Sequence, residues 1–241
     1  MNKLSYDATW TDLVAMTRAN ANVLIILAGA FLFLPNFAQL LLAPMPEPKT
    51  FDWNAIKAFN EYFRENMLVL ILCKLPVWLG TAGMLSLLLD PRRPTVGEAL
   101  SGALSLLIGF VLLDWLTQLI AFGGLFLLLI PGIYIIGRLA LAAPAQMAER
   151  LFNPVAAITR SFAITKGNGW RTSGILFLFA LILFVAGAAL QPVAGIVFAL
   201  ILPATIKVVM TALLKAAINA VAALVITLLS AALYRQLAST T

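Results

Sequence analysis

The sequence predicts an all-α polytopic membrane helix bundle with six transmembrane helices and additional interfacial amphipathic helices. Hydrophobic residues make up 62% of the 241 residues and charged residues 11%, whereas soluble domains average about 45–50% and about 25%. A chain of this size cannot bury so much apolar surface in one water-soluble core. Its apolar runs are unbroken and lack the alternating pattern of outer-membrane barrels. We therefore expect residues 1–241 to form a single integral membrane domain.

The N-terminal segment, residues 1–21, is too polar before its first apolar run to be a secretory signal peptide. Its apolar residues recur at helical spacing and predict an amphipathic helix: Tyr6, Trp10, Leu13 and Val14. Ser5 or Asp7 would cap the start of this helix. We expect the helix to lie in the membrane interface; the alternative is an ordinary polar lead-in to the first span.

Six apolar segments follow, each long enough for the roughly 20 residues that cross a bilayer core. They are residues 22–43, 67–89, 100–122, 125–147, 174–190 and 205–234. Pro35 is expected to kink the first segment, and five spans would result if that segment were re-entrant there. The Gly123-Gly124 pair should separate the third segment from the fourth, and Gln191-Pro192 should interrupt the fifth.

Basic residues in the connecting segments predict the orientation, because Lys and Arg are in excess on the cytoplasmic side. With a cytoplasmic N-terminus, nine basic residues fall inside: Lys3, Arg18, Arg92, Arg93, Arg150, Arg160, Lys166, Arg171 and Arg235. Three fall outside: Lys49, Lys57 and Arg64. Both termini are therefore expected in the cytoplasm. The aromatic-rich outer loop, residues 44–66, is expected to form a second interfacial helix.

The most patterned inner segment is the cytoplasmic amphipathic loop at residues 148–172. Asn153-Pro154 is a good helix start, and Gly167 is placed to end the helix. An apolar stripe lies between them: Val155, Ile158 and Phe162. The basic residues of the segment are candidates for binding anionic lipid headgroups: Arg150, Arg160, Lys166 and Arg171. The alternative is a connector that is basic only because inner loops are basic.

A resemblance to known membrane proteins is carried by residues 131–171, PGIYIIGRLALAAPAQMAERLFNPVAAITRSFAITKGNGWR. This run resembles the membrane domain found beside glycerophosphoryl diester phosphodiesterases and the related YciC-like bacterial inner-membrane proteins. The matching features are Pro131-Gly132 before Arg138, an Ala/Pro-rich span end, Glu149, Pro154, Arg160-Ser161 and Thr165-Lys166-Gly167. The resemblance implies a bacterial inner-membrane protein and little about activity, and no segment provides the TIM barrel of the phosphodiesterase.

Ionisable residues inside the predicted spans are site candidates, because they cost a few kcal/mol or more unless paired or hydrated. We assign Lys207 no role, since it can reach the outer interface. The candidate intramembrane polar site consists of Lys74, Asp114, Arg138 and Lys215. At about 1.5 Å per residue, Lys74 matches Asp114 best in depth and Lys215 next. One interpretation is a structural ion pair between the second and third spans; the other is a polar cavity with a basic lining for a lipid phosphate or another anion.

The last span carries small residues on one face: Ala212, Ala216, Ala220 and Ala223, with Asn219 beside them. Small residues let membrane helices approach closely. We expect the fifth and sixth spans to pack on each other, with homodimerisation as the alternative use of this face.

The chain has no histidine, one cysteine, and no P-loop, HExxH, GxSxG or paired-carboxylate pattern. We therefore expect no enzymatic activity, no catalytic residues, no cofactor, no metal site and no nucleic-acid partner. The expected partners are membrane lipids or a membrane protein. The predicted function is a non-enzymatic bacterial inner-membrane protein that binds lipids or a partner in envelope maintenance. The alternative is a transporter or flippase-like carrier of an anionic or lipid substrate.

Overall fold

A computed structural model describes residues 4–46, 50, 52–127 and 129–238, and within these ranges every regular element is a helix. The helices are α1 Tyr6–Leu27, η1 Ala28–Phe33, α2 Leu34–Leu42, α3 Trp53–Leu89, α4 Val96–Leu127, α5 Leu129–Leu139, α6 Ala142–Ala148, α7 Pro154–Ile164, α8 Gly169–Ile201 and α9 Ala204–Ala238. Five helical units in the described ranges are long and apolar enough to cross a membrane. The chain is therefore a multi-pass membrane protein.

The first of these units is continuous from Tyr6 to Leu42, so the N-terminal segment is not a separate helix as the sequence predicted. Ser5 caps α1, as expected, by accepting a hydrogen bond from the Ala8 N–H. Pro35 lacks an N–H and would clash within a regular α-helix. The chain accommodates it with the wider π-helical turn of η1, in which the Leu34 N–H bonds to the Gly29 carbonyl.

The second unit, α3, begins at Trp53 and so includes most of the outer loop, residues 44–66, for which the sequence predicted a separate interfacial helix. Asp52 caps α3, its carboxylate accepting a hydrogen bond from the Ala55 N–H at 2.9 Å, and the helix then continues past Pro76 to Leu89. The π-helical turn packs directly on α3 at Gly80, where an added Cβ would lie 2.2 Å from the Phe31 Cβ. Lys3 and Lys49, two of the residues used to predict orientation, lie outside the described residues.

The predicted fourth span does not form one helix. The chain stays helical through Gly123 and Gly124, so α4 extends to Leu127. The return segment then consists of the short helices α5 and α6, separated by a turn at Ala140 and Leu141. Pro144 explains this turn, because its ring cannot coexist with a helical carbonyl four residues earlier, at Ala140. The sequence prediction therefore placed the start of this segment within α4 and missed its internal turn, whereas its predicted end at Met147 lies one residue from the end of α6.

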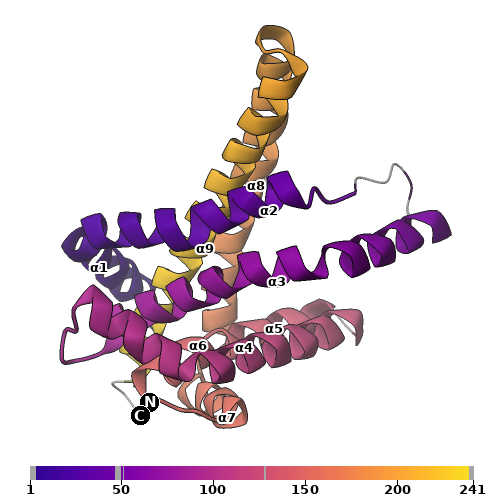
Figure 1. Ribbon diagram of the computed structural model, residues 1–241. Helices are drawn as coiled ribbons and strands as arrows, with labels where there is room; N and C mark the ends of the chain where they lie inside the picture. Colours follow the sequence, from indigo (N-terminus) through magenta and orange to yellow (C-terminus); the bar gives the residue numbers. More distant parts are fainter. Residues whose placement is uncertain (1–3, 47–49, 51, 128, 239–241) are drawn as a thin grey trace.

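The last two long helices, α8 and α9, form a hairpin that projects away from the layer of α2, α3, α4 and α5 (Figure 1). The predicted interruption at Gln191-Pro192 is wrong, since α8 runs through Pro192 to Ile201. The two helices pack along each other as expected. Ala212, Ala216 and Ala220 of α9 are buried.

The short helix α7 begins at the predicted cap, with the Asn153 side chain accepting from the Val155 N–H at 2.9 Å. Gly167 follows its end with φ of 81°, a left-handed conformation that favours glycine. The buried face differs from the predicted stripe: Ala157, Ser161 and Ile164 face inward, whereas Val155 is 58% exposed.

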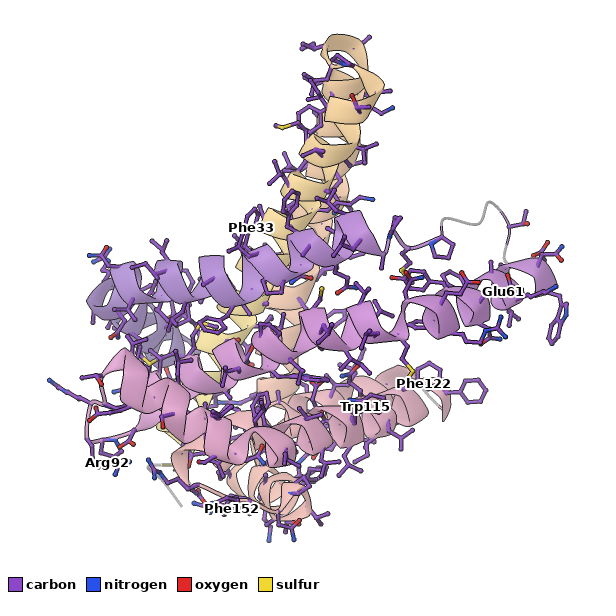
Figure 2. All side chains as sticks on the ribbon, viewed as in Figure 1. Phe33, Glu61, Arg92, Trp115, Phe122 and Phe152 are labelled. Carbon is purple, nitrogen blue, oxygen red and sulfur yellow. The ribbon has the colours of Figure 1, made fainter. Side chains whose placement is uncertain are left out.

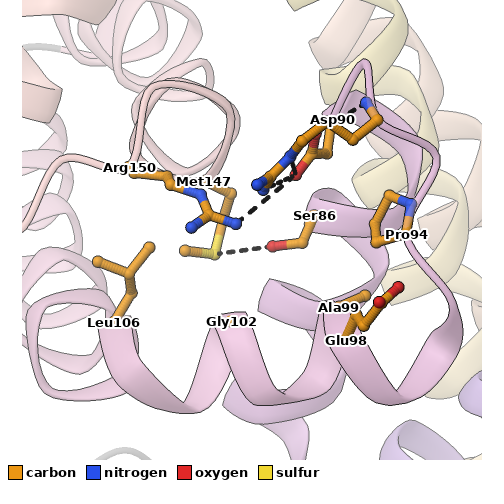
Figure 3. A pocket seen from close by; sticks show the side chains of 10 residues that line it. Ser86, Asp90, Pro94, Glu98, Ala99, Gly102, Leu106, Met147 and Arg150 are labelled. Carbon is orange, nitrogen blue, oxygen red and sulfur yellow. Dashed lines mark hydrogen bonds and ion pairs between the residues drawn. The ribbon is translucent and has the colours of Figure 1, made fainter.

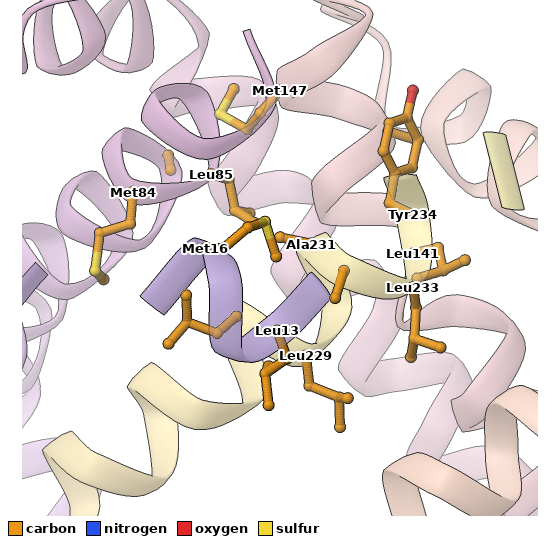
Figure 4. Packing of buried hydrophobic residues seen from close by; sticks show 14 of the residues in the cluster. Leu13, Met16, Met84, Leu85, Leu141, Met147, Leu229, Ala231, Leu233 and Tyr234 are labelled. Atoms are coloured by element: carbon orange, nitrogen blue, oxygen red, sulfur yellow. The ribbon is translucent and has the colours of Figure 1, made fainter. Parts of the chain in front are cut away.

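The main hydrophobic core lies around the C-terminal end of α9, where this helix meets α1, α3 and the α5–α6 turn (Figure 4). Leu229, Ala231 and Leu233 are at most 1% exposed, and Leu85 and Leu141 pack into the same cluster. Small residues such as Ala231 allow several helices to approach α9 at one level. The core is therefore concentrated toward the end of the bundle that carries both chain termini (Figure 1).

Large apolar side chains cover the helix surfaces away from this core, as the all-side-chain view illustrates (Figure 2). Trp115 and Phe122 of α4 are 66% and 71% exposed, and Leu200 at the tip of the α8–α9 hairpin is 81% exposed. A water-soluble protein would not display so continuous an apolar surface. These faces match the hydrocarbon region of a bilayer, where lipid takes the place of core neighbours.

We predict that Gly137→Ala destabilises the protein by about 1–3 kcal/mol, the usual cost of overpacking. The α5 and α8 backbones meet at Gly137, where an added Cβ would lie 2.4 Å from the Ser173 Cα. Gly174→Ala is the matched control, because nothing lies within 4 Å of its added Cβ and alanine favours the helix. Equilibrium unfolding in mixed micelles measures both, and equal stability of the two variants would contradict the close approach.

Candidate functional site

Both chain termini, the α3–α4 turn and the α6–α8 region meet at one end of the bundle, which we call the charged end (Figure 1). The Leu4 N–H donates to the Asn168 Oδ1 at 3.0 Å, and Arg171 donates back to the Leu4 carbonyl at 2.9 Å. Thr9 of α1 donates to Gln236 of α9 at 2.6 Å. The N-terminal residues are thereby fixed against the α7–α8 junction and the end of α9.

Asp90 at the α3–α4 turn brings two guanidinium groups together. Asp90 accepts hydrogen bonds from the Arg92 backbone and guanidinium, and Arg150 from the end of α6 lies 3.7 Å from the same carboxylate (Figure 3). Hydrogen bonding by Arg92, with Arg150 nearby, lowers the pKa of Asp90 to about 2. Asp90 therefore stays ionised and organises the turn.

Two arginines of this region hold backbone conformations that ordinarily belong to glycine. Arg93 has φ of 51° and Arg150 has φ of 52°. Arg150 occupies the residue after the cap of α6, and the following Leu151 N–H bonds to the Gln146 carbonyl, a helix-ending arrangement in which glycine is usual. Each left-handed non-glycine residue costs of order 1 kcal/mol or more. Strained positions of this kind cluster at functional sites, which makes Arg93 and Arg150 candidates for a functional role.

The four candidate headgroup-binding residues do not converge on one point. Arg150 faces Asp90, and the Arg160 Nε donates to Glu149 at 2.7 Å. Arg171 holds the Leu4 carbonyl, and Lys166 is exposed. The sequence did not single out Arg93 and Arg235 as site residues, but the fold brings both to the charged end of the bundle. The only sequence signal for Arg93 was its place in the turn Asp90-Pro91-Arg92-Arg93-Pro94.

A cavity of about 920 Å³ lies between α1, the end of α3 and the α3–α4 turn. Arg93, Arg235, Asp12 and Asp90 provide the charged lining, and most of the remainder is apolar, including Val23 of α1 and Leu88 of α3. Asp12 forms an ion pair with Arg235 at 3.3 Å. Within the described part of the chain, the Arg93 guanidinium has no hydrogen bond or ion pair.

Arg138, one of the four intramembrane candidates, is engaged by α7. Its guanidinium donates to the Phe162 carbonyl and to the Thr165 Oγ1, the latter at 3.1 Å, and stacks 4.4 Å from the centre of the Phe162 ring. The Ser161 hydroxyl donates to the Arg138 carbonyl at 2.5 Å. A cation at the C-terminal end of a helix is favourable. Arg138 therefore caps α7 and ties it to α5.

The remaining candidates separate into two places. Asp114 accepts hydrogen bonds from the Trp78 indole at 2.9 Å and from Gln118 at 2.6 Å. Lys74 forms no ion pair with Asp114; its Nζ lies 5.9 Å from the centre of the Trp78 ring. Lys215 is half-buried on α9, which packs against α2, α3 and α8. Trp78 thus stands between the two charges that depth alone had paired.

No family model, curated protein or solved structure matches this chain. The resemblance to YciC-like proteins therefore stays a prediction, and functional inference depends on the geometry above.

We predict that Asp90→Asn lowers stability at neutral pH and that this loss shrinks in acid. A depressed native pKa means that Asp90 contributes its full stabilisation above its unfolded pKa of roughly 4. The contribution disappears as the pH falls through about 2, where the native carboxylate is protonated. Thermal unfolding of the wild type and Asp90→Asn from pH 7 to pH 2.5 measures the gap, and a pH-independent gap would exclude this role.

Proposed function

We propose that this chain is a non-enzymatic bacterial inner-membrane protein that binds anionic lipid headgroups at its charged end. One observation carries the proposal: Arg93, which is backbone-strained and whose guanidinium has no partner among the described residues, lines a cavity of about 920 Å³ that also has apolar walls. A phospholipid has the matching two-part chemistry, an anionic phosphate joined to acyl chains. The resemblance to YciC-like inner-membrane proteins supports the location.

The local charges favour Arg93 as the phosphate-binding group. Asp90 is held by Arg92 and Arg150, and Asp12 is paired with Arg235. Of the two arginines among the described residues that line the cavity, Arg235 is paired, and the Arg93 guanidinium is left available to an outside anion. A guanidinium binds phosphate through two parallel N–H donors, which a lysine cannot reproduce.

The acyl chains would lie along the apolar side of the same cavity. Val23 and Met16 of α1 face Leu87 and Leu88 of α3 across it. The cavity therefore offers charge where the helices end and apolar surface where they enter the bilayer. A water-soluble anion would use only the charged part, so we propose a lipid as the ligand.

The charged end also suggests how the protein is oriented in the membrane. We propose that the charged end faces the cytoplasm, in line with the excess of basic residues there. Leu4 and Gln236 both lie at this end, so the chain must cross the membrane an even number of times. The pair α5–α6, which packs on α4, would then provide the return crossing that no single long helix makes.

The alternative, a carrier for an anion, is less well supported. The cavity next to Asp114 has no lysine or arginine among its described lining residues. Arg138 is committed to α7, and Lys74 to Trp78. The basic lining that an anion would require is therefore missing around Asp114.

We expect native mass spectrometry of the protein in its own lipids to retain an anionic phospholipid adduct, and Arg93→Ala to lose it. Loss of one charge-assisted phosphate contact should weaken binding about tenfold. Arg64→Ala is the matched control, because it removes an exposed arginine from the opposite end of α3. Titration with phosphatidylglycerol and phosphatidylcholine tests charge selectivity. Equal adducts in both variants, or no preference for the anionic lipid, would refute the proposal.

A second variant separates lipid binding from folding. Arg93→Gly removes the guanidinium but fits the backbone φ of 51° better than arginine does. We expect its stability to stay within about 1 kcal/mol of the wild type, since relief of strain offsets the added chain entropy. Chemical unfolding and native mass spectrometry on the same sample measure both properties. A stable Arg93→Gly variant that keeps the lipid would contradict the role of Arg93.

A further inference from the structure

A second cavity, distant in sequence from the charged turn, lies between α4 and the α5–α6 segment. Its volume is about 260 Å³, larger than the roughly 150 Å³ cavity that holds a benzene molecule in other proteins. The polar lining consists of Asp114, Thr117 and Gln118 from one face of α4, and the rest is apolar, including Phe110 and Ile136. An apolar pocket with a few converging polar groups is the usual form of a small-molecule site.

Only one of the two Asp114 carboxylate oxygens accepts hydrogen bonds from the described residues. Its Oδ2 accepts both hydrogen bonds, from Trp78 at 2.9 Å and from Gln118 at 2.6 Å. Its Oδ1 has no hydrogen-bond donor within the described ranges. A carboxylate offers about four acceptor positions. The two fixed bonds hold the group in place and leave one oxygen for a ligand.

Within the described residues, no ion pair neutralises the Asp114 carboxylate. Trp78 is 8% exposed and anchors the carboxylate from α3. Lys74, the first of the predicted basic partners, contacts the ring of Trp78 and forms no ion pair with Asp114. No basic residue is found among the described residues that line the cavity. An anion would meet a carboxylate that has no ion-pair partner among the described residues, whereas a cation would neutralise it in a medium of low dielectric constant.

We infer that the Asp114 cavity binds a small organic cation, a primary ammonium carried on a short apolar body. The ammonium has three donors, two of which would bond to Oδ1 of Asp114 and to the Thr117 hydroxyl oxygen. The apolar body would lie against Phe110 and Ile136. A bare divalent metal ion fits poorly, because Ca²⁺ and Mg²⁺ need six or more oxygen ligands. The described residues contain no group of three His, Cys, Asp or Glu side chains placed to hold a metal.

The cavity is open toward the membrane side of the bundle. Gln118 is exposed, and Trp115, the neighbour of Asp114, is 66% exposed on α4 (Figure 2). An amphiphilic amine dissolved in the bilayer could therefore reach Asp114 sideways, between α4 and α5. This site is separate from the proposed lipid site at Arg93, and neither depends on the other.

The test uses the full chain in phosphatidylcholine nanodiscs, with empty nanodiscs as the blank, and ligand-observed ¹⁹F NMR. Three probes share one body and differ in charge: 4-fluorobenzylamine, 4-fluorobenzyl alcohol and 4-fluorobenzoate. We expect the amine to bind about tenfold or more tightly than the alcohol, and the benzoate not to bind above the blank. Equal binding of amine and alcohol, or preferential binding of benzoate, would overturn the inference.

Variants assign the binding to this cavity. Asp114→Asn keeps the shape and an acceptor oxygen but removes the charge, and should abolish the preference for the amine. Glu61→Gln is the matched control, because it removes an exposed acid near the start of α3, and should leave amine binding unchanged. If Asp114→Asn fails to fold, Ala121→Phe, which fills the cavity from its lining, should block the amine. Unchanged amine binding in a folded Asp114→Asn or Ala121→Phe variant would overturn the inference.

Discussion

The contacts between the end of α9 and the N-terminal residues are the interaction on which the rest of the bundle depends. The α8–α9 hairpin projects away from the other long helices (Figure 1), so its position is fixed mainly near its base. There, Gln236 bonds to Thr9 and Arg235 to Asp12, while Tyr234 donates to Glu149 at 2.9 Å. Several polar contacts on one helix end orient α9 more narrowly than apolar packing alone, because hydrogen bonds are directional.

The positions of most long helices were readable from the sequence, but the interruptions were not. Gly123-Gly124 and Pro192 were expected to break helices, and both lie within continuous helices. In water a glycine pair costs about 2 kcal/mol of helix stability, but in lipid an unbonded backbone group costs more. The helix therefore continues. Pro144, by contrast, does interrupt the helix between α5 and α6. This turn is tolerated because it lies inside the protein, where Leu141 is completely buried.

The sequence identified the charged residues of the candidate sites but did not predict which residues they contact. Depth counting placed Lys74 and Asp114 at one level, yet depth does not give the direction in which each side chain leaves its helix. The structure inserts Trp78 between them. Arg138 was assigned to the membrane interior, but its partners lie 24 and 27 residues later in the chain, on α7 and at its C-cap. Such long-range partners have no signature in a single sequence.

The two cavities differ in charge for a reason that follows from their depth. Arg93 lies on a turn at the end of the bundle, where water and salt weaken any single charge contact. Its affinity for a phosphate must therefore come from the two parallel N–H donors of the guanidinium. Asp114 lies within an apolar helix, where the same charge acts over a lower dielectric constant and attracts a counter-charge more strongly. A part-buried carboxylate that the protein leaves half-bonded within an apolar helix is costly. Trp78 and Gln118 hold the carboxylate in place in α4, and a guest cation that completes its hydrogen bonds would offset this cost.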